Sequence, residues 1–159
     1  MSKRLLEGQP DGETDADALA RRVADRMLSK EGTGPAWDLV IEEAREGYAR
    51  VRMLLRDDMA NGHGIAHGGM IFALADTAFA YACNSRNSAA VAAHASISFL
   101  SPAKVGETLV AEAEERARNG RSGVYAVRVT AGDGRTIAEF QGLSREIGGP
   151  ILDPLEGQP

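Results

Sequence analysis

The feature that most constrains the fold is a long apolar segment, Met70–Cys83, in the middle of the chain. With its neighbours it reads "GGMIFALADTAFAYACN" (68–84), and its many Ala, Leu and Met residues predict a helix that ends at Asn84-Ser85. Because this helix is apolar on nearly every side, we expect it to be buried rather than to lie on the surface. The rest of the chain must therefore fold around it.

The segments on both sides of this helix have the pattern of strands. Two strands precede it, with a turn near Glu46-Gly47, and four follow it; their expected ranges are 36–43, 47–56, 89–103, 107–118, 123–132 and 136–147. The sequences "RNGRSG" and "GDGR" predict hairpin turns, since Asn and Gly tolerate positive φ. Strands joined by short turns form an antiparallel sheet, so we expect an α+β fold with the central helix on one face. Apolar residues at helical spacing predict an additional N-terminal helix over 15–32.

Length and charge limit the class of protein. At 159 residues the chain has the length of one domain, and its net charge of −5 argues against a general nucleic-acid binder. The single cysteine, Cys83, excludes an internal disulfide and fits a cytoplasmic location. We expect neither a secretory signal nor a membrane span, because no apolar stretch has the length or place that either needs. Residues 1–14 are expected to be a disordered tail and 150–159 an irregular one, which leaves 15–149 as the single domain.

One carboxylate, Asp76, interrupts the apolar helix. Its neighbours at i±3 and i±4 are apolar, and no Lys or Arg within the helix can pair with it. An unpaired buried carboxylate is costly, and its pKa shifts upward. Two interpretations remain open: Asp76 faces a solvent crevice or caps a backbone group, or it is held at a pocket or interface as a base or nucleophile.

The start of the helix is the second candidate site. His67-Gly68-Gly69 lies where the first helical N–H groups are unpaired, and these groups favour an anion or a developing oxyanion. The alternative is that the glycines only make a turn. His63 and His67 have the spacing of a helical zinc pair, but glycines flank His63 and too few other ligands are near, so we expect no metal site. His67 either orients the loop, approaches a substrate carbonyl, or is a structural histidine.

These residues carry a resemblance to a known family. The segment "NGHGIAHGGMIFALADTAFAYACNS" (61–85), followed by "FLSPAKVGETL" and "GVY", resembles the phenylacetic-acid-degradation thioesterases of the hotdog-fold superfamily. The resemblance covers roughly residues 20–149. It implies a hotdog fold, in which a long central helix is wrapped by an antiparallel sheet, and chains that form a homodimer and then a homotetramer.

The resemblance also implies roles for particular residues. It puts the catalytic acid at Asp76, the oxyanion-hole N–H at Gly68, the asparagine that positions the thioester or the water at Asn61, and the histidine before the glycine at His67. Gly69 falls in the substrate site. Coenzyme A phosphates need cationic partners; Arg118, Lys104 and Arg145 are candidates, and the resemblance favours Arg121 with Ser122. The Ser or Thr that holds water in some relatives is absent, because that region reads Ala92-Ala93-His94.

The implied activity is hydrolysis of a small aryl-acetyl-CoA, either phenylacetyl-CoA or a ring-hydroxylated phenylacetyl-CoA, to the free acid and CoA in phenylacetate catabolism. No cofactor is expected, because coenzyme A is part of the substrate. Asp76 would either deprotonate water or attack the carbonyl carbon. Two alternatives stay open: a hotdog dehydratase or hydratase that uses His67 with Asp76, and a non-catalytic acyl-CoA-binding protein, which has no need for Asp76.

Helix geometry predicts how many chains one site needs. If Gly68 opens the helix, Asp76 lies eight residues along it, or about 12 Å. An Asp side chain cannot cover this distance to a carbonyl held at Gly68 of the same chain. Two such helices, packed antiparallel across a twofold axis, bring Asp76 of one chain to Gly68 of the other. We therefore expect a homodimer with two shared sites.

Overall fold

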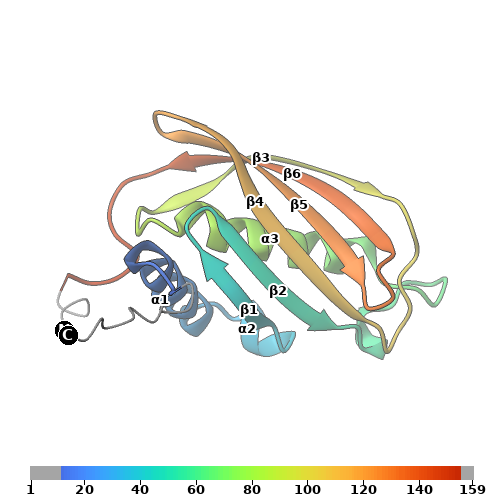
Figure 1. Cartoon of the computed structure of the whole chain (residues 1–159). Helices are drawn as coiled ribbons and strands as arrows, with labels where there is room; N and C mark the ends of the chain where they lie inside the picture. The colour runs from blue at the N-terminus through green and yellow to red at the C-terminus, as the bar shows by residue number, and fades with distance from the viewer. Residues whose placement is uncertain (1–11, 155–159) are drawn as a thin grey trace, which may run out of the picture.

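The computed structural model describes residues 12–154, which form one antiparallel sheet, a long helix across it and a helix at the N-terminal side (Figure 1). The expected α+β fold is confirmed. The helices are α1 (Asp15–Lys30), α2 (Thr33–Ala36), the 3-10 turn η1 (Asp57–Met59) and α3 (Gly68–Asn84). The strands are β1 (Val40–Arg45), β2 (Tyr48–Leu54), β3 (Ala90–Phe99), β4 (Thr108–Asn119), β5 (Ser122–Ala131) and β6 (Thr136–Glu146).

The sheet has six strands in the order β1-β2-β4-β5-β6-β3. Every pairing is antiparallel, and among the described residues β3 is an edge strand that pairs only with β6. The pairing of β3 shifts register between Ala92 and His94, which marks a β-bulge. Beyond the bulge, Phe99 pairs with Ala138 at one end of β3, and Ala90 pairs with Glu146 at the other.

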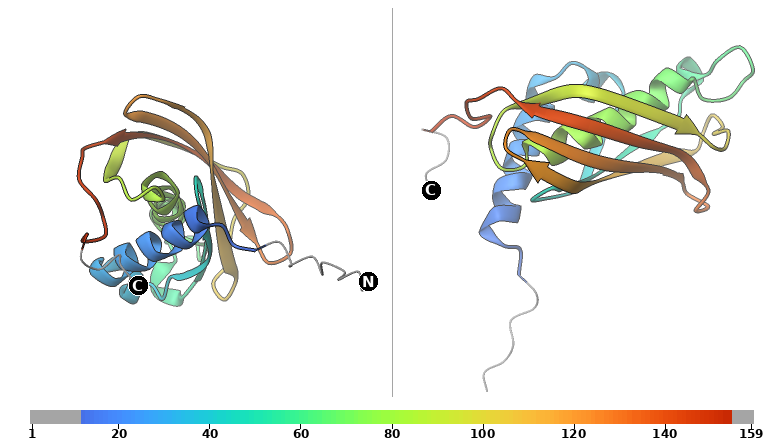
Figure 2. Two further views of the ribbon diagram at one scale, coloured as in Figure 1. Left: turned by 60° about the vertical axis from the view of Figure 1, so that its left-hand side comes forward. Right: turned by 90° about the horizontal axis from the view of Figure 1, so that it is seen from above.

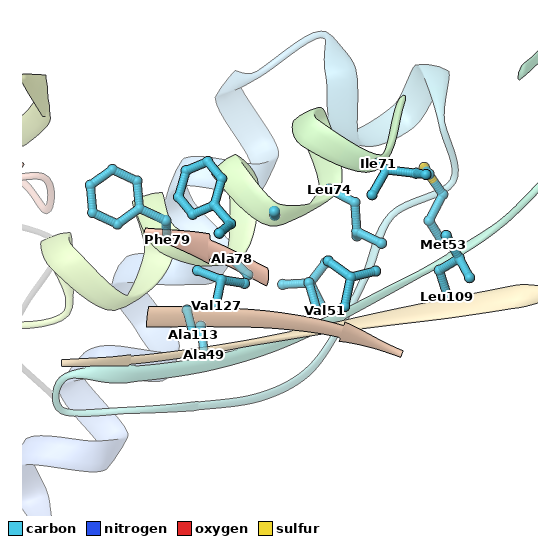
Figure 3. Close-up of a cluster of buried hydrophobic side chains, with 14 of the residues drawn as sticks. Ala49, Val51, Met53, Ile71, Leu74, Ala78, Phe79, Leu109, Ala113 and Val127 are labelled. Atoms are coloured by element: carbon cyan, nitrogen blue, oxygen red, sulfur yellow. The ribbon is translucent and has the colours of Figure 1, made fainter. Parts of the chain in front are cut away.

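The central helix α3 packs across the concave face of the sheet, which curves around it (Figure 2). Strand residues at every second position point at the helix, as period-2 alternation requires. The resulting core is fully apolar and contains Ala49, Val51 and Met53 of β2, Leu109 and Ala113 of β4, Val127 of β5, and Ile71, Leu74 and Ala78 of α3 (Figure 3). The predicted bounds of this helix agree with the observed ones, and most of its surface is buried.

The N-terminal helix α1 packs against β1 and α3. Thr14 caps it, because the Thr14 hydroxyl oxygen accepts from the N–H of Asp17 at 3.1 Å. At its other end the Tyr81 hydroxyl of α3 donates to Glu31. The expected strand at 36–43 begins later, at Val40, because Thr33–Ala36 form a short helix and Asp38 turns the chain with φ of 50°.

The segment after β6 has no helix or strand up to residue 154, yet it is attached to the domain. The side-chain oxygen of Asn87 accepts from the N–H groups of Ile151 and Leu152 at 2.9 and 2.8 Å, and Leu152 is buried. The expected tails were 1–14 and 150–159, and most of the first (1–11) and the end of the second (155–159) lie outside the described residues. Within residues 12–154, no helix combines the length and the apolar character that a membrane crossing requires.

Candidate active site

The first turn of α3 presents one N–H group that no described residue uses. His67 is the N-cap of the helix, and its Nδ1 accepts from the N–H of Gly69 at 2.8 Å. The carbonyl of His67 accepts from Met70 at 2.9 Å. Within residues 12–154, the N–H of Gly68 therefore remains as the one early donor of α3 without an acceptor. The histidine cap selects which glycine N–H can meet a ligand.

The loop before the helix is closed by Asn61. Its side-chain oxygen accepts from the N–H of His63 at 2.9 Å and from that of Ile65 at 3.4 Å, and Gly64 at φ of 74° completes the turn. Both bonds come from N–H donors, so the atom of the Asn61 amide that accepts them must be its oxygen. The NH2 group of the amide is therefore the end that points away from the turn's hydrogen bonds. No residue of the described chain accepts from that NH2 group. Asn61 therefore offers a second donor.

These two donors line the same pocket, which has a volume of about 420 Å³. Its walls come from the loop, from the start of α3 and from the segment after β3; the lining residues are Asn61, Ile65, Ala66, Gly68, Ile71, Phe99, Leu100, Ser101, Pro102 and Ala103. The loop is held against that segment by a hydrogen bond from the N–H of Ala66 to the carbonyl of Ala103 at 2.8 Å. A pocket that is mostly apolar with a few convergent donors is the usual form of a small-molecule site.

Asp76 lies outside this pocket, two turns further along α3. It is half-buried, and burial alone raises the pKa of its carboxyl group above the ordinary value, since no charged or hydrogen-bonding neighbour within 12–154 contributes. The helix face around it is less covered than the rest: Phe72, Ala73 and Ala80 are also only half-buried. Asp76 thus stands at the centre of a stripe of mostly small side chains that the sheet of its own chain covers only in part.

The remaining predicted site residues are at the far end of the molecule. Arg121 and Ser122 form the β4–β5 hairpin, where Arg121 Nε and Nη2 donate to the carbonyl of Glu146 at 3.1 and 2.7 Å. Glu146, and with it the hairpin, lies beside Ala90, the first residue of β3. Phe99, the last residue of the same strand, is nine residues further along and contacts Gly68. At the rise of an extended strand the hairpin and Gly68 are about 30 Å apart. One chain therefore brings together Asn61, Gly68 and the His67 cap, but neither Asp76 nor the hairpin.

Phe99 and the residues after it were missed as site residues by the sequence prediction. They belong to "FLSPA", which supported only the resemblance, and no local pattern in the sequence shows that this aromatic residue is exposed at a pocket. A larger hollow of about 530 Å³ lies at the charged face of the sheet. Its arginines are occupied in ion pairs, for example Arg86 with Glu115 and Arg128 with Glu139, so it offers no comparable set of free donors.

The comparisons with known proteins agree with this geometry. The sequence model of the Thioesterase superfamily matches residues 63–138. The chain is 43% identical to the acyl-coenzyme A thioesterase PaaI of Escherichia coli over 128 residues, which cover 80% of this chain and 91% of that protein. The solved structure of the E. coli PaaI protein from the phenylacetic acid degradation operon superposes with a TM-score of 0.84 and 40% identity, over 86% of this chain and 99% of that one.

A more distant solved structure is that of a hypothetical thioesterase from Streptococcus pneumoniae with coenzyme A. It has a TM-score of 0.68 and 25% identity, and the match covers 70% of this chain and 90% of that one. The resemblance to the phenylacetic-acid-degradation thioesterases is thereby confirmed. The chain belongs to the thioesterase superfamily, and it is a thioester hydrolase with the hotdog fold.

Proposed function

We propose that the protein hydrolyses a small aryl-acetyl-CoA, such as phenylacetyl-CoA or its ring-hydroxylated form, to the free acid and CoA. The name of the E. coli relative supports the acyl-CoA class, and the operon of that relative supports the phenylacetate pathway. The S. pneumoniae structure contains coenzyme A, which supports the thiol part of the substrate. Coenzyme A is then a substrate component, no separate cofactor takes part, and we place the reaction in the cytoplasm.

The observation that carries the proposal is the pair of free donors, the N–H of Gly68 and the NH2 group of Asn61, in one apolar pocket. A thioester carbonyl oxygen bound there would receive both donors as negative charge develops on it, and the start of α3 adds the positive end of the helix dipole. His67 keeps the N–H of Gly69 occupied, so it acts by fixing the first turn.

Asp76 supplies the remaining chemistry. Burial raises the pKa of its carboxyl group, which makes its ionised form a stronger base than an exposed aspartate. It either takes a proton from the attacking water or attacks the carbonyl carbon itself to form a mixed anhydride, which water then hydrolyses. In both routes the thiolate of CoA leaves and takes up a proton.

We also propose a second chain at each site, and the distance along α3 supports it. Gly68 and Asp76 are separated by eight residues, or about 12 Å, and the stripe around Asp76 is covered only in part. Two α3 helices packed antiparallel through Ala73, Asp76 and Ala80 would place each carboxylate at the pocket of the other chain. The unpaired edge of β3, with Val91 at 47% exposure, supports the same pairing.

Antiparallel pairing of two chains would also bring the distant β4–β5 hairpin of one chain near the pocket of the other. The end of one chain that carries Arg121 and Ser122 comes toward the start of α3 in the other chain, so these residues remain proposed contacts of the CoA phosphates. Gly69 is proposed to contact the substrate through its Cα surface, because its N–H is occupied. We further propose that two such dimers form a tetramer.

The test is release of free thiol from a panel of acyl-CoA thioesters. We expect the highest kcat/KM with aryl-acetyl groups, and Asp76→Asn should lose activity while it remains folded. Asp57→Asn makes the same chemical change on an exposed residue of η1 and should leave activity unchanged. Binding of the thioesters without release of thiol by the wild-type protein would overturn the proposal and favour the non-catalytic alternative. Hydration of an enoyl-CoA instead would favour the hydratase.

A further inference from the structure

Phe99 is a large aromatic side chain in an unusual place. It ends the edge strand β3, and 53% of its surface is exposed although it lies on the face of the sheet that meets α3. The other aromatic residues on this face pack against one another: Phe72 lies at 5.3 Å from Phe140, and Phe79 at 5.4 Å from Tyr125, between ring centroids. Phe99 takes no part in those contacts, so the core does not explain it.

Its ring lies directly over the start of α3. A Cβ atom added to Gly68 would lie 3.1 Å from Cζ of Phe99, and two further ring carbons lie within 3.6 Å of that point. The ring therefore covers the Cα side of Gly68, a residue that lines the pocket and whose N–H has no acceptor within residues 12–154. A carbonyl group bound to that N–H would have to lie next to the ring.

The pocket beside the ring is suited to an uncharged group. Ile65, Ile71, Leu100 and Pro102 line it, and no charged side chain is among its walls. Its polar groups are Asn61, the backbone of Gly68 and Ser101. The first two are engaged with the carbonyl under the proposed function, so the walls left for the acyl group are mostly apolar, and one of them is the aromatic side chain of Phe99.

We propose that Phe99 is a specificity-determining residue: its ring is the wall on which the acyl group lies, and it selects acyl groups that are flat and aromatic over saturated ones of the same size. The proposal rests on the proposed thioesterase function and adds the residue that sets the acyl preference. Stacked or edge-to-face aromatic pairs are more stable than contact area alone provides. Phe99 carries no group that could transfer a proton or attack the carbonyl carbon, so we expect it to act on substrate choice.

The experiment compares two thioesters that differ only in the ring, phenylacetyl-CoA and cyclohexylacetyl-CoA. Phe99→Leu keeps an apolar side chain at the pocket and removes the π face. We expect the ratio of kcat/KM for the aromatic over the saturated substrate to fall about three- to tenfold in this variant. The matched control is Leu100→Ala, which removes apolar surface from the same pocket and should lower kcat/KM for both substrates alike.

The same proteins are used to measure the dissociation constants of both thioesters in the Asp76→Asn background, where turnover is removed. The affinity ratio should fall with Phe99→Leu as the kinetic ratio does. An unchanged ratio, or an equal loss for both substrates, would overturn the proposal, the latter because the ring would then contact the CoA part. If the wild-type protein hydrolyses neither thioester, the proposed function fails, and the binding ratio of the wild type against Phe99→Leu still decides the placement of the ring.

Discussion

A mixture of two inactive variants tests whether one site is shared by two chains. Asp76→Asn removes the carboxylate, and Gly68→Pro removes the N–H donor at the start of α3. Proline is compatible with this position, because Gly68 is the first helical residue and His67 before it is extended, with ψ of 132°. The N–H that is lost has no acceptor within the described chain, so the fold should keep all its hydrogen bonds.

The magnitude follows from the number of intact sites. Loss of one oxyanion donor lowers kcat by about 10²–10³, so each parent homodimer should be nearly inactive. In a mixed dimer with shared sites, one site combines the intact Asp76 of the Gly68→Pro chain with the intact Gly68 of the Asp76→Asn chain. The other site carries both substitutions. Purified mixed dimers should therefore show about half of the wild-type activity per dimer, far above either parent.

The assay uses co-expression of the two chains with different affinity tags, isolation of dimers that carry both tags, and measurement of thiol release. Gly68→Ala is the matched control, because it adds the same Cβ, which meets Phe99 at 3.1 Å, and keeps the N–H. Verified mixed dimers that are no more active than the parents would refute the shared site, provided that circular dichroism shows Gly68→Pro to be folded. Equal inactivity of Gly68→Ala and Gly68→Pro would show that crowding against Phe99, and not the donor, causes the loss.

Three further predictions concern Asp76 and His67. Burial raises the pKa of Asp76, so the ionised carboxylate destabilises the folded state. Asp76→Asn should therefore unfold at pH 7 at a urea concentration no lower than that of the wild type. The difference between the two proteins should shrink as the pH falls through the raised pKa, because the wild-type carboxyl group then becomes neutral too. For the same reason kcat/KM should decline on acidification with a midpoint above ~3.9, and a flat profile down to pH 4 would contradict the base role. His67→Ala should lower the free energy of unfolding by about 1 kcal/mol in urea titrations, while His67→Asn, a good N-cap, should retain it; equal stability of both would contradict the cap.

Much of the fold could be predicted because its signals are local. The helix at 68–84 is apolar over most of its length, and the hairpin turns contain glycines that adopt positive φ, such as Gly120 at 58° and Gly134 at 87°. The strand order could not be read in the same way, because β3 pairs with β6 across the whole second half of the chain. The short helix at Thr33–Ala36 was hidden by its Gly-Pro pair, which reads as a terminator.

The candidate site was predicted in part for the same reason. Asn61, His67 and Gly68 lie within eight residues of each other, so one motif contains them all. Phe99 comes to Gly68 only through the β3–β6 pairing, and no local pattern announces that contact. The half-covered stripe around Asp76 is equally invisible in the sequence, because an apolar residue looks the same whether its own chain or another covers it.

The place of β3 in the sheet has a consequence for the order in which the protein is made. β3 leaves the ribosome directly after α3, but β6, the one strand that pairs with it within residues 12–154, is synthesised only after β4 and β5. At about 5–20 residues per second, several seconds pass in which α3 and its glycines exist without Phe99 in place. Until β6 is made, β3 therefore has no neighbouring strand among the described residues, and the aromatic wall beside Gly68 is one of the late features of the fold to be put in place.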